Sequence, residues 1–214
     1  MNIYTFYEPE PILADHENEQ LIELWKKNWA SHGWTPVVLT IKQSCLHPNW
    51  PKLKEAFSRL PSVNPGQYDQ YCYYRWVAMV VVGGGWMADY DVFNYGFEPC
   101  NPTADLVMAS SFPSIVPCLV GGTPSGFQKA SDMLSVAKCR PDDLINNRPH
   151  ISDMIIAQRD FGSDECQYVK QDIVRTYDDQ DESWKTSPAV HYSCSSMNRN
   201  KLMPKWKHIP NLRQ

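Results

Sequence analysis

An apolar run that ends in three glycines and is followed by two closely spaced aspartates constrains this chain more than any other feature. Residues 77–82 are Val-Ala-Met-Val-Val-Val, residues 83–85 are all glycine, and Asp89 and Asp91 follow with one residue between them. Three glycines end whatever element the apolar run forms, so residues 86–92 can begin a new extended segment. In a strand, side chains two residues apart share a face, and the two carboxylates would converge there. Oxygen ligands at that spacing suit Mn²⁺ or Mg²⁺ bound together with phosphate.

A bare Asp-x-Asp is equally compatible with a simple turn. Aspartates just past a strand often form turns in which the carboxylate bonds to the neighbouring backbone. An EF-hand loop is excluded, because its sixth position counted from Asp89 is Asn94 instead of glycine and its twelfth is Cys100 instead of glutamate. The two aspartates alone leave the metal site and the turn open.

Strand and helix patterns alternate along the chain. Alternation of this kind predicts an α/β fold with a mostly parallel central sheet flanked by helices, and ligands bind such sheets at the carboxyl ends of the strands. The length of 214 residues fits one domain of this type. The predicted strands are 3–7, 35–41, 105–109 and 115–120, and the predicted helices are 17–30, 51–60, 68–82, 125–137 and 152–159.

Composition excludes several classes of protein. The net charge is −4 and the isoelectric point is about 5.8, so no overall basic field for nucleic acid is expected. The seven cysteines are scattered and form no Cys-x-x-Cys pair, which argues for reduced thiols in a cytoplasmic setting. The first residues lack a signal-peptide pattern, and the longest apolar run is too short and too rich in glycine to span a bilayer.

The residues around the aspartates resemble the signature of GT-A glycosyltransferases, in particular their sugar-binding-region group. That signature consists of an arginine, an apolar helix, two glycines, an aromatic residue and Asp-x-Asp. Arg75, Trp86, Asp89 and Asp91 occupy these positions in the same order. The resemblance implies a GT-A fold with a Rossmann-like nucleotide-binding half, in which Asp89 and Asp91 bind the metal and Asp89 also contacts the nucleotide.

This segment departs from the family pattern in two places. The family has an aspartate three residues before the arginine that contacts a sugar hydroxyl, whereas this chain has Cys72. A third glycine also lengthens the spacing by one residue. Asp69 lies one helical turn before Cys72 and is a candidate to replace the missing contact.

The carboxy-terminal segment extends the resemblance. Residues 189–193 predict a short strand that carries His191, and a basic tail follows. The arrangement is similar to the ending of retaining GT-A enzymes, which implies that His191 is the third metal ligand. It also implies that Lys201, with Arg199 as a rival, holds the diphosphate. Taken alone, His191 is equally a structural residue, and the tail is equally a solvated surface or a membrane contact.

The resemblance also implies a donor pocket. Residues 152–156 resemble a family helix start whose aspartate, here Asp153, bonds to donor hydroxyls, although Asp153 by itself could simply cap the helix. Arg75 would bridge the donor sugar and a carboxylate. The end of the first strand seats the nucleoside in this family, which assigns that role to Thr5, Phe6 and Tyr7.

The implied activity is metal-dependent transfer of a hexose from a nucleotide sugar, with UDP as the expected nucleotide, to a glycan or glycoprotein, with retention of configuration. Residues 1–92 would form the nucleotide-sugar half, and residues 93–214 the acceptor half and closing tail. The chain also resembles modules that large algal viruses use to glycosylate capsid proteins, which would place it in the host cytoplasm.

Three other functions compete. A haloacid-dehalogenase-type phosphatase also uses Asp-x-Asp after an apolar strand, but in its first strand and followed by a threonine that is missing after Asp91. A non-catalytic sugar-binding module would bind the donor without turnover. A nucleotidyltransferase would need a glycine-rich basic loop near the first strand, and residues 1–20 contain none.

Overall fold

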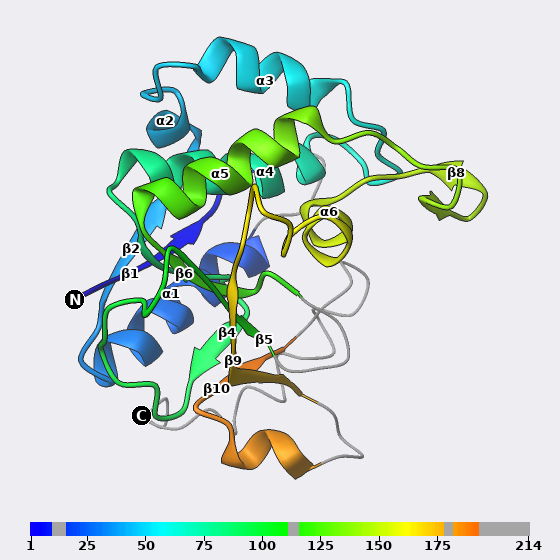
Figure 1. Ribbon diagram of the computed structural model, residues 1–214. Coiled ribbons are helices and arrows are strands. Elements are labelled where there is room, and N and C mark those ends of the chain that lie inside the picture. The colour runs from blue at the N-terminus through cyan, green and yellow to red at the C-terminus, as the bar shows by residue number, and fades with distance from the viewer. Residues whose placement is uncertain (10–15, 111–115, 178–181, 193–214) are drawn as a thin grey trace.

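The computed structural model describes residues 1–9, 16–110, 116–177 and 182–192, and these form a mixed α/β fold around one large curled sheet (Figure 1). The order of its strands is β2-β1-β3-β6-β5-β9-β10-β4. Their bounds are β1 Asn2–Phe6, β2 Thr35–Leu39, β3 Gly85–Ala88, β4 Val92–Asn94, β5 Leu106–Ser110, β6 Leu119–Gly122, β9 Val169–Thr176 and β10 Ala189–His191. A separate hairpin consists of β7 Leu144–Ile145 and β8 Arg148–Pro149.

The sheet is mostly parallel, as predicted. β1 pairs in parallel with β2 and β3, and β9 pairs in parallel with β5 and β10. β6 runs antiparallel between β3 and β5, and β4 runs antiparallel to β10. Because β6 is antiparallel to both of its neighbours, β1, β3, β5 and β10 all point the same way. Their carboxyl ends therefore lie along one edge of the sheet.

Helices cover both faces of the sheet. The helices are α1 His16–Ser31, α2 Ile41–Ser44, α3 Trp50–Ser58, α4 Tyr68–Val81, α5 Pro124–Val136 and α6 Asp153–Arg159, with a 3₁₀ helix at Glu182–Thr186. Side chains alternate between the two faces: Tyr4 and Met87 pack with α3, α4 and α5, whereas Ile3 and Trp86 pack with α1. Both faces are thus buried at the centre of the sheet, which explains why β5 and β6 are buried throughout and have no polar side.

The three glycines turn the chain from α4 into β3, as the sequence predicts. All three have positive φ values, of 91°, 77° and 112° for Gly83, Gly84 and Gly85. The Gly84 N–H donates to the carbonyl of Met79 at 2.9 Å, which closes the end of the helix. A Cβ atom at Gly84 would lie 2.5 Å from the carbonyl oxygen of Gly122, so this position also allows close backbone packing.

Several predicted elements differ from those observed. Residues 86–92 are not one strand: β3 stops at Ala88, and Asp89 to Asp91 form a turn that leads into β4. The strand predicted at 35–41 stops at Leu39, because Thr40 caps the short helix α2 in a capping box with Gln43. The strand predicted at 115–120 begins only at Leu119.

Candidate functional site

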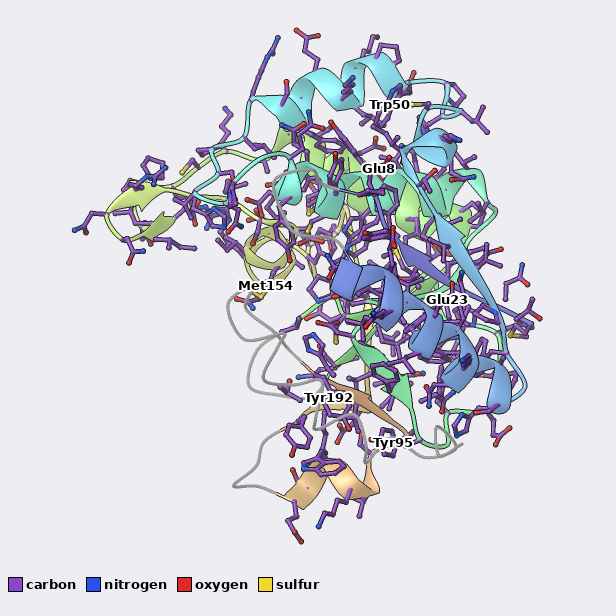
Figure 2. The ribbon with its side chains drawn as sticks, turned by 180° about the vertical axis from the view of Figure 1, so that it is seen from behind. Glu8, Glu23, Trp50, Tyr95, Met154 and Tyr192 are labelled. Atoms are coloured by element: carbon purple, nitrogen blue, oxygen red, sulfur yellow. The ribbon has the colours of Figure 1, made fainter. Side chains whose placement is uncertain are left out.

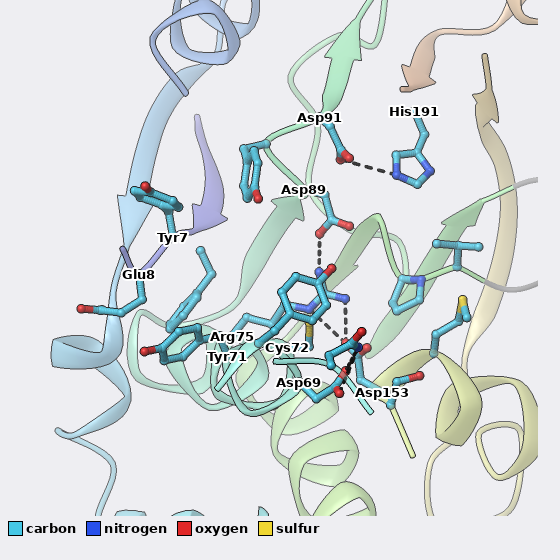
Figure 3. Close-up of a pocket in the computed structure, with 18 of the residues that line it drawn as sticks. Tyr7, Glu8, Asp69, Tyr71, Cys72, Arg75, Asp89, Asp91, Asp153 and His191 are labelled. Atoms are coloured by element: carbon cyan, nitrogen blue, oxygen red, sulfur yellow. Dashed lines mark hydrogen bonds and ion pairs between the residues drawn. The ribbon is translucent and has the colours of Figure 1, made fainter. Parts of the chain in front are cut away.

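A pocket of about 400 Å³ opens at the carboxyl edge of the sheet (Figure 3). Its walls come from the residues that follow β1 and β3, from the first turns of α4 and α6, and from His191 at the end of β10. This is where the sequence predicts a ligand, because strand ends and helix N-termini meet at such an edge. The lining includes five carboxylates, at Glu8, Asp69, Asp89, Asp91 and Asp153.

Asp89, Asp91 and His191 form a candidate metal centre. Each offers one ligand atom, and these atoms all lie within 4.8 Å of one another. The Nε2 atom of His191 lies 3.4 Å from Oδ1 of Asp91 (Figure 3). Two carboxylates and an imidazole are a donor set that fits a divalent ion such as Mn²⁺. The three predicted ligands therefore come together and could hold such an ion.

The two aspartates converge because of a turn and not because they share a strand face. The N–H of Val92 donates to the carbonyl of Asp89 at 2.9 Å, which closes the turn. The N–H of Tyr192 donates to the carbonyl of Asp91 at 2.9 Å, which ties the turn to the end of β10 next to His191. The turn and the metal site, left as alternatives by the sequence, are thus compatible in one structure.

Arg75 links the candidate metal centre to Asp153. Its Nη1 donates to Oδ1 of Asp89, and its Nε and Nη2 donate to Oδ2 of Asp153 at 3.1 and 2.7 Å. The indole Nε1 of Trp76 donates to the same oxygen at 3.0 Å. Arg75 and Asp153 are both buried, so this is an ion pair shielded from water. The sequence assigned both residues to the donor pocket, and they lie in contact there.

Ionisation of the centre depends on its burial and charges. Burial raises the pKa of the Asp89 carboxyl to about 6; Asp91 and Asp153 also raise it, while Arg75 and His191 lower it. Burial alone would lower the pKa of His191, but Cys118 and Asp91 beside it hold that pKa well above its ordinary value. Protons on Asp89 and His191 would therefore compete with a metal cation for the same ligand atoms.

The pocket carries an excess of negative charge. Against its five carboxylates, Arg75 is the only Lys or Arg among the described lining residues, and it is already paired with Asp89 and Asp153. A phosphate-bearing ligand would meet net repulsion in this arrangement. A bound divalent cation would offset that repulsion.

Asp69 belongs to a second polar group on the pocket wall. Its carboxylate accepts hydrogen bonds from the Ser62 hydroxyl and from the Asn64 amide, at 3.1 and 3.2 Å for the latter. His150 Nδ1 lies 3.8 Å away and accepts a hydrogen bond from the N–H of Val63. Burial raises the pKa of Asp69. These contacts hold the loop before α4 against the segment before α6.

The remaining predicted residues fall into three groups. Phe6 and Tyr7 line the pocket, whereas Thr5 is buried and is not part of the lining. Lys201 and Arg199 lie outside the described residues. Asp153 is the first residue of α6, but Ser152 is the residue that caps this helix, by accepting from the N–H of Ile155 at 3.3 Å.

Several lining residues have no sequence signal that identifies them. His150 stands alone in sequence, and its partner Asp69 is 81 positions away. Glu8 also lines the pocket and accepts a hydrogen bond from the N–H of Ile41 at 2.9 Å. Ile145 and Met154 join the lining from the β7–β8 hairpin and from α6. These residues can be identified as pocket-lining residues only from the folded structure, which brings them together.

The comparisons with known proteins place the chain in a family. Residues 1–110, which include α4, the glycines and the Asp-x-Asp turn, match the family described as a domain of unknown function, DUF8765. The chain belongs to this family. No curated protein matches the chain. Among the described residues, no helix of this DUF8765 member is both long and apolar enough to cross a membrane.

A solved structure shares the fold of this family member over nearly its full length. It is described as the "crystal structure of a glycosyltransferase involved in the glycosylation of the major capsid of PBCV-1". The similarity has a TM-score of 0.57 and 11% sequence identity, and it covers 95% of this chain and 98% of the other. At this identity the comparison shows a glycosyltransferase-like fold.

Proposed function

We propose that this chain is a metal-dependent glycosyltransferase that moves a sugar from a nucleotide sugar to a hydroxyl group of a glycan or glycoprotein. The observation that carries this proposal is the convergence of Asp89, Asp91 and His191 at the carboxyl edge of a sheet whose overall fold is that of a glycosyltransferase. We assign these three residues to a Mn²⁺ or Mg²⁺ ion, UDP to the nucleotide and a hexose to the sugar. When bound, the ion would neutralise the negative charge that develops on the leaving diphosphate.

Arg75 and Asp153 orient the donor sugar in this proposal. All three hydrogen bonds described for the Asp153 carboxylate go to its Oδ2 atom. We therefore assign its second oxygen, Oδ1, to a hydroxyl of the sugar. Arg75 holds this carboxylate and Asp89 at the same time, so one planar guanidinium fixes the distance between the sugar contact and the metal ligands.

An aromatic group takes the nucleoside. Tyr7 follows β1, and its ring meets the ring of Tyr90 edge to face, with the ring centroids 5.9 Å apart. Tyr90 lies between the two aspartates of the turn, so this group sits directly beside the candidate metal centre. With Phe6, these rings offer a surface on which a base can stack. The described pocket has no Lys or Arg besides Arg75, which is already paired. We therefore assign the second contact to the diphosphate to Lys201, or to Arg199 in its place.

The partners of the carboxylates favour retention of configuration. An inverting enzyme needs a carboxylate that is free to accept the proton of the attacking hydroxyl. Here Asp89 and Asp153 pair with Arg75, and Asp91 lies beside His191. The two remaining carboxylates among the described lining residues, Glu8 and Asp69, accept hydrogen bonds from Ile41 and from Ser62 and Asn64.

The test is a screen of nucleotide sugars with and without Mn²⁺. A UDP-hexose should raise the melting temperature of the chain only when Mn²⁺ is present, because a ligand that binds the native state stabilises it. The same donor should be hydrolysed slowly without acceptor. Asp91→Ala should abolish both effects. The matched control is Asp132→Ala, which removes an exposed carboxylate from α5, outside the pocket lining.

Each other outcome rejects the proposal in a defined way. Donor binding that is equally tight in Asp91→Ala with Mn²⁺ present would remove the metal centre from the mechanism. Binding of the donor without any turnover would indicate a sugar-binding module. Release of phosphate from a simple phosphomonoester would indicate a phosphatase that uses Asp89 as nucleophile.

A further inference from the structure

Exposed apolar side chains gather at the mouth of the pocket. The described part of the chain has eight large apolar residues that are exposed, and three of these, Tyr68, Ile145 and Met154, line the pocket. Leu144 is also exposed and precedes Ile145 in the hairpin. Single exposed apolar side chains are ordinary, but a group at the rim of a pocket marks a binding surface.

Tyr68 belongs to the metal end of this rim. Its ring lines the same pocket as Asp89, Tyr90 and Asp91, the residues of the Asp-x-Asp turn. Ile145 and Met154 come from different elements, the hairpin and the first turn of α6. These two side chains form the aliphatic part of the rim. Figure 2 shows Met154 at the surface of the molecule.

The hairpin that carries Ile145 projects beyond α6 and is held by charges (Figure 1). Its two turn residues, Asn146 and Asn147, have positive φ values of 52° and 61°, as a tight two-residue hairpin turn requires. At its base, Arg159 of α6 pairs with Asp143 at 2.5 Å and with Asp160 at 2.7 Å. These groups are largely buried, so the hairpin is fixed to the helix that carries Met154.

Packing does not explain the aliphatic side chains. Leu144, Ile145 and Met154 belong to neither of the two buried clusters that flank the sheet. Ile145 and Met154 also offer no side-chain donor to a sugar hydroxyl, and a hydroxyl placed against them would lose its hydrogen bonds to water. A ligand group that packs against these two side chains is therefore expected to be apolar.

We propose that Ile145 and Met154 bind an aliphatic group attached to the acceptor sugar, so that the acceptor is an alkyl glycoside or a molecule of that chemistry. This inference rests on the proposed function, because it takes the carboxylate and metal end of the pocket as the donor site. Ile145 and Met154 line the same pocket and are exposed, so they belong to its outer part. It therefore lies where the non-reacting part of an acceptor leaves the pocket.

The test compares hexyl and methyl glycosides of the same sugar. Protein carrying ¹³C-labelled methionine methyl groups is titrated with each, and the Met154 signal is assigned from its loss in Met154→Leu. Hexyl glucoside should bind at least about tenfold more tightly than methyl glucoside and shift the Met154 signal. Ile145→Asn should remove most of this difference. Val136→Asn, which changes an equally apolar exposed residue on α5, should not.

Equal affinities for the hexyl and methyl glycosides would overturn the inference, as would an Ile145→Asn variant that binds hexyl glucoside like the wild type. Tighter binding of p-nitrophenyl glucoside than of hexyl glucoside would replace the aliphatic group with an aromatic one and overturn the assignment. The proposed function is tested separately on the wild-type chain by Mn²⁺-dependent donor binding. If donor binding fails while hexyl glucoside still binds, the glycosyltransferase assignment falls and the aliphatic site stands.

Discussion

The ion pair between Arg75 and Asp153 makes a quantitative prediction about stability that does not depend on function. Asp153→Ala leaves the buried guanidinium of Arg75 with Asp89 as its remaining carboxylate, and it removes the acceptor of the Trp76 indole. Removing one partner of a buried ion pair costs about 3–5 kcal/mol. The total stability of a domain is about 5–15 kcal/mol, so this one change should remove a large share of it.

Two comparison variants separate the charge from the hydrogen bonds. Asp153→Asn keeps an amide oxygen that can accept from Trp76 and Arg75, so it should cost less than Asp153→Ala, about 1–3 kcal/mol. Asp105→Ala breaks the exposed pair with Lys129 of α5, with an N···O distance of 3.2 Å, and should lower the free energy of unfolding far less than Asp153→Ala does. The measurement is urea unfolding followed by tryptophan fluorescence and circular dichroism.

The decisive result is the order of the three losses in the free energy of unfolding, which should decrease from Asp153→Ala to Asp153→Asn to Asp105→Ala. The free energy of unfolding of Asp153→Ala could instead lie within about 1 kcal/mol of the wild-type value. In that case Asp153 is not the structural partner of Arg75, and the pocket is arranged differently. If Asp153→Asn is stable but loses turnover while keeping its affinity for UDP, the carboxylate contacts the donor sugar, because UDP lacks the sugar hydroxyls. Equal losses for UDP and UDP-sugar would leave Asp153 with a structural role alone.

Three further results are expected. Because burial raises the pKa of Asp89 to about 6, protons compete with Mn²⁺ for this ligand. The affinity for Mn²⁺ measured by calorimetry should therefore fall as the pH is lowered from about 7 to about 5, and a constant affinity over this range would contradict the ligand assignment. Gly84→Ala should lower the free energy of unfolding by about 2–5 kcal/mol, because the new Cβ meets the Gly122 carbonyl. Gly83→Ala has open space around it and should lower the free energy of unfolding by only about 1–2 kcal/mol, so equal losses would contradict the close packing. Lys201→Ala should slow sugar transfer and leave the unfolding curve unchanged; an unchanged rate in both Lys201→Ala and Arg199→Ala would remove the tail from the mechanism.

The fold was predictable where the pattern of apolar residues is local. The core of β1, β2 and β5 and the helices α1, α4 and α5 lie close to their predicted bounds, because each presents a continuous apolar face. The strand β9 was missed, since most residues of Val169–Thr176 are polar or charged and the segment gains its place from pairing with β5 and β10. The β7–β8 hairpin was missed because its turn is Asn-Asn and its strands are two residues long.

The candidate site divides in the same way. Asp89, Asp91, His191, Arg75 and Asp153 were predicted together, because each belongs to a short motif with a resemblance to a known family. What sequence could not supply was their pairing. The bonds of Arg75 to both Asp89 and Asp153 join residues 14 and 78 positions apart, and no local pattern encodes that contact.

The turn at Asp89 to Asp91 shows how predicted side chains can come together although the element predicted for them is wrong. A strand would place the two carboxylates on one face, nearly two residue rises apart, with Tyr90 on the other face. The observed turn instead bends the chain, and Tyr90 packs against Tyr7 while both carboxylates stay within reach of His191. The turn therefore brings an aromatic ring and two candidate metal ligands to the same pocket from three consecutive residues. A continuous strand would place the ring and the carboxylates on opposite faces of the sheet, so the turn is the arrangement that suits the proposed nucleotide and metal site.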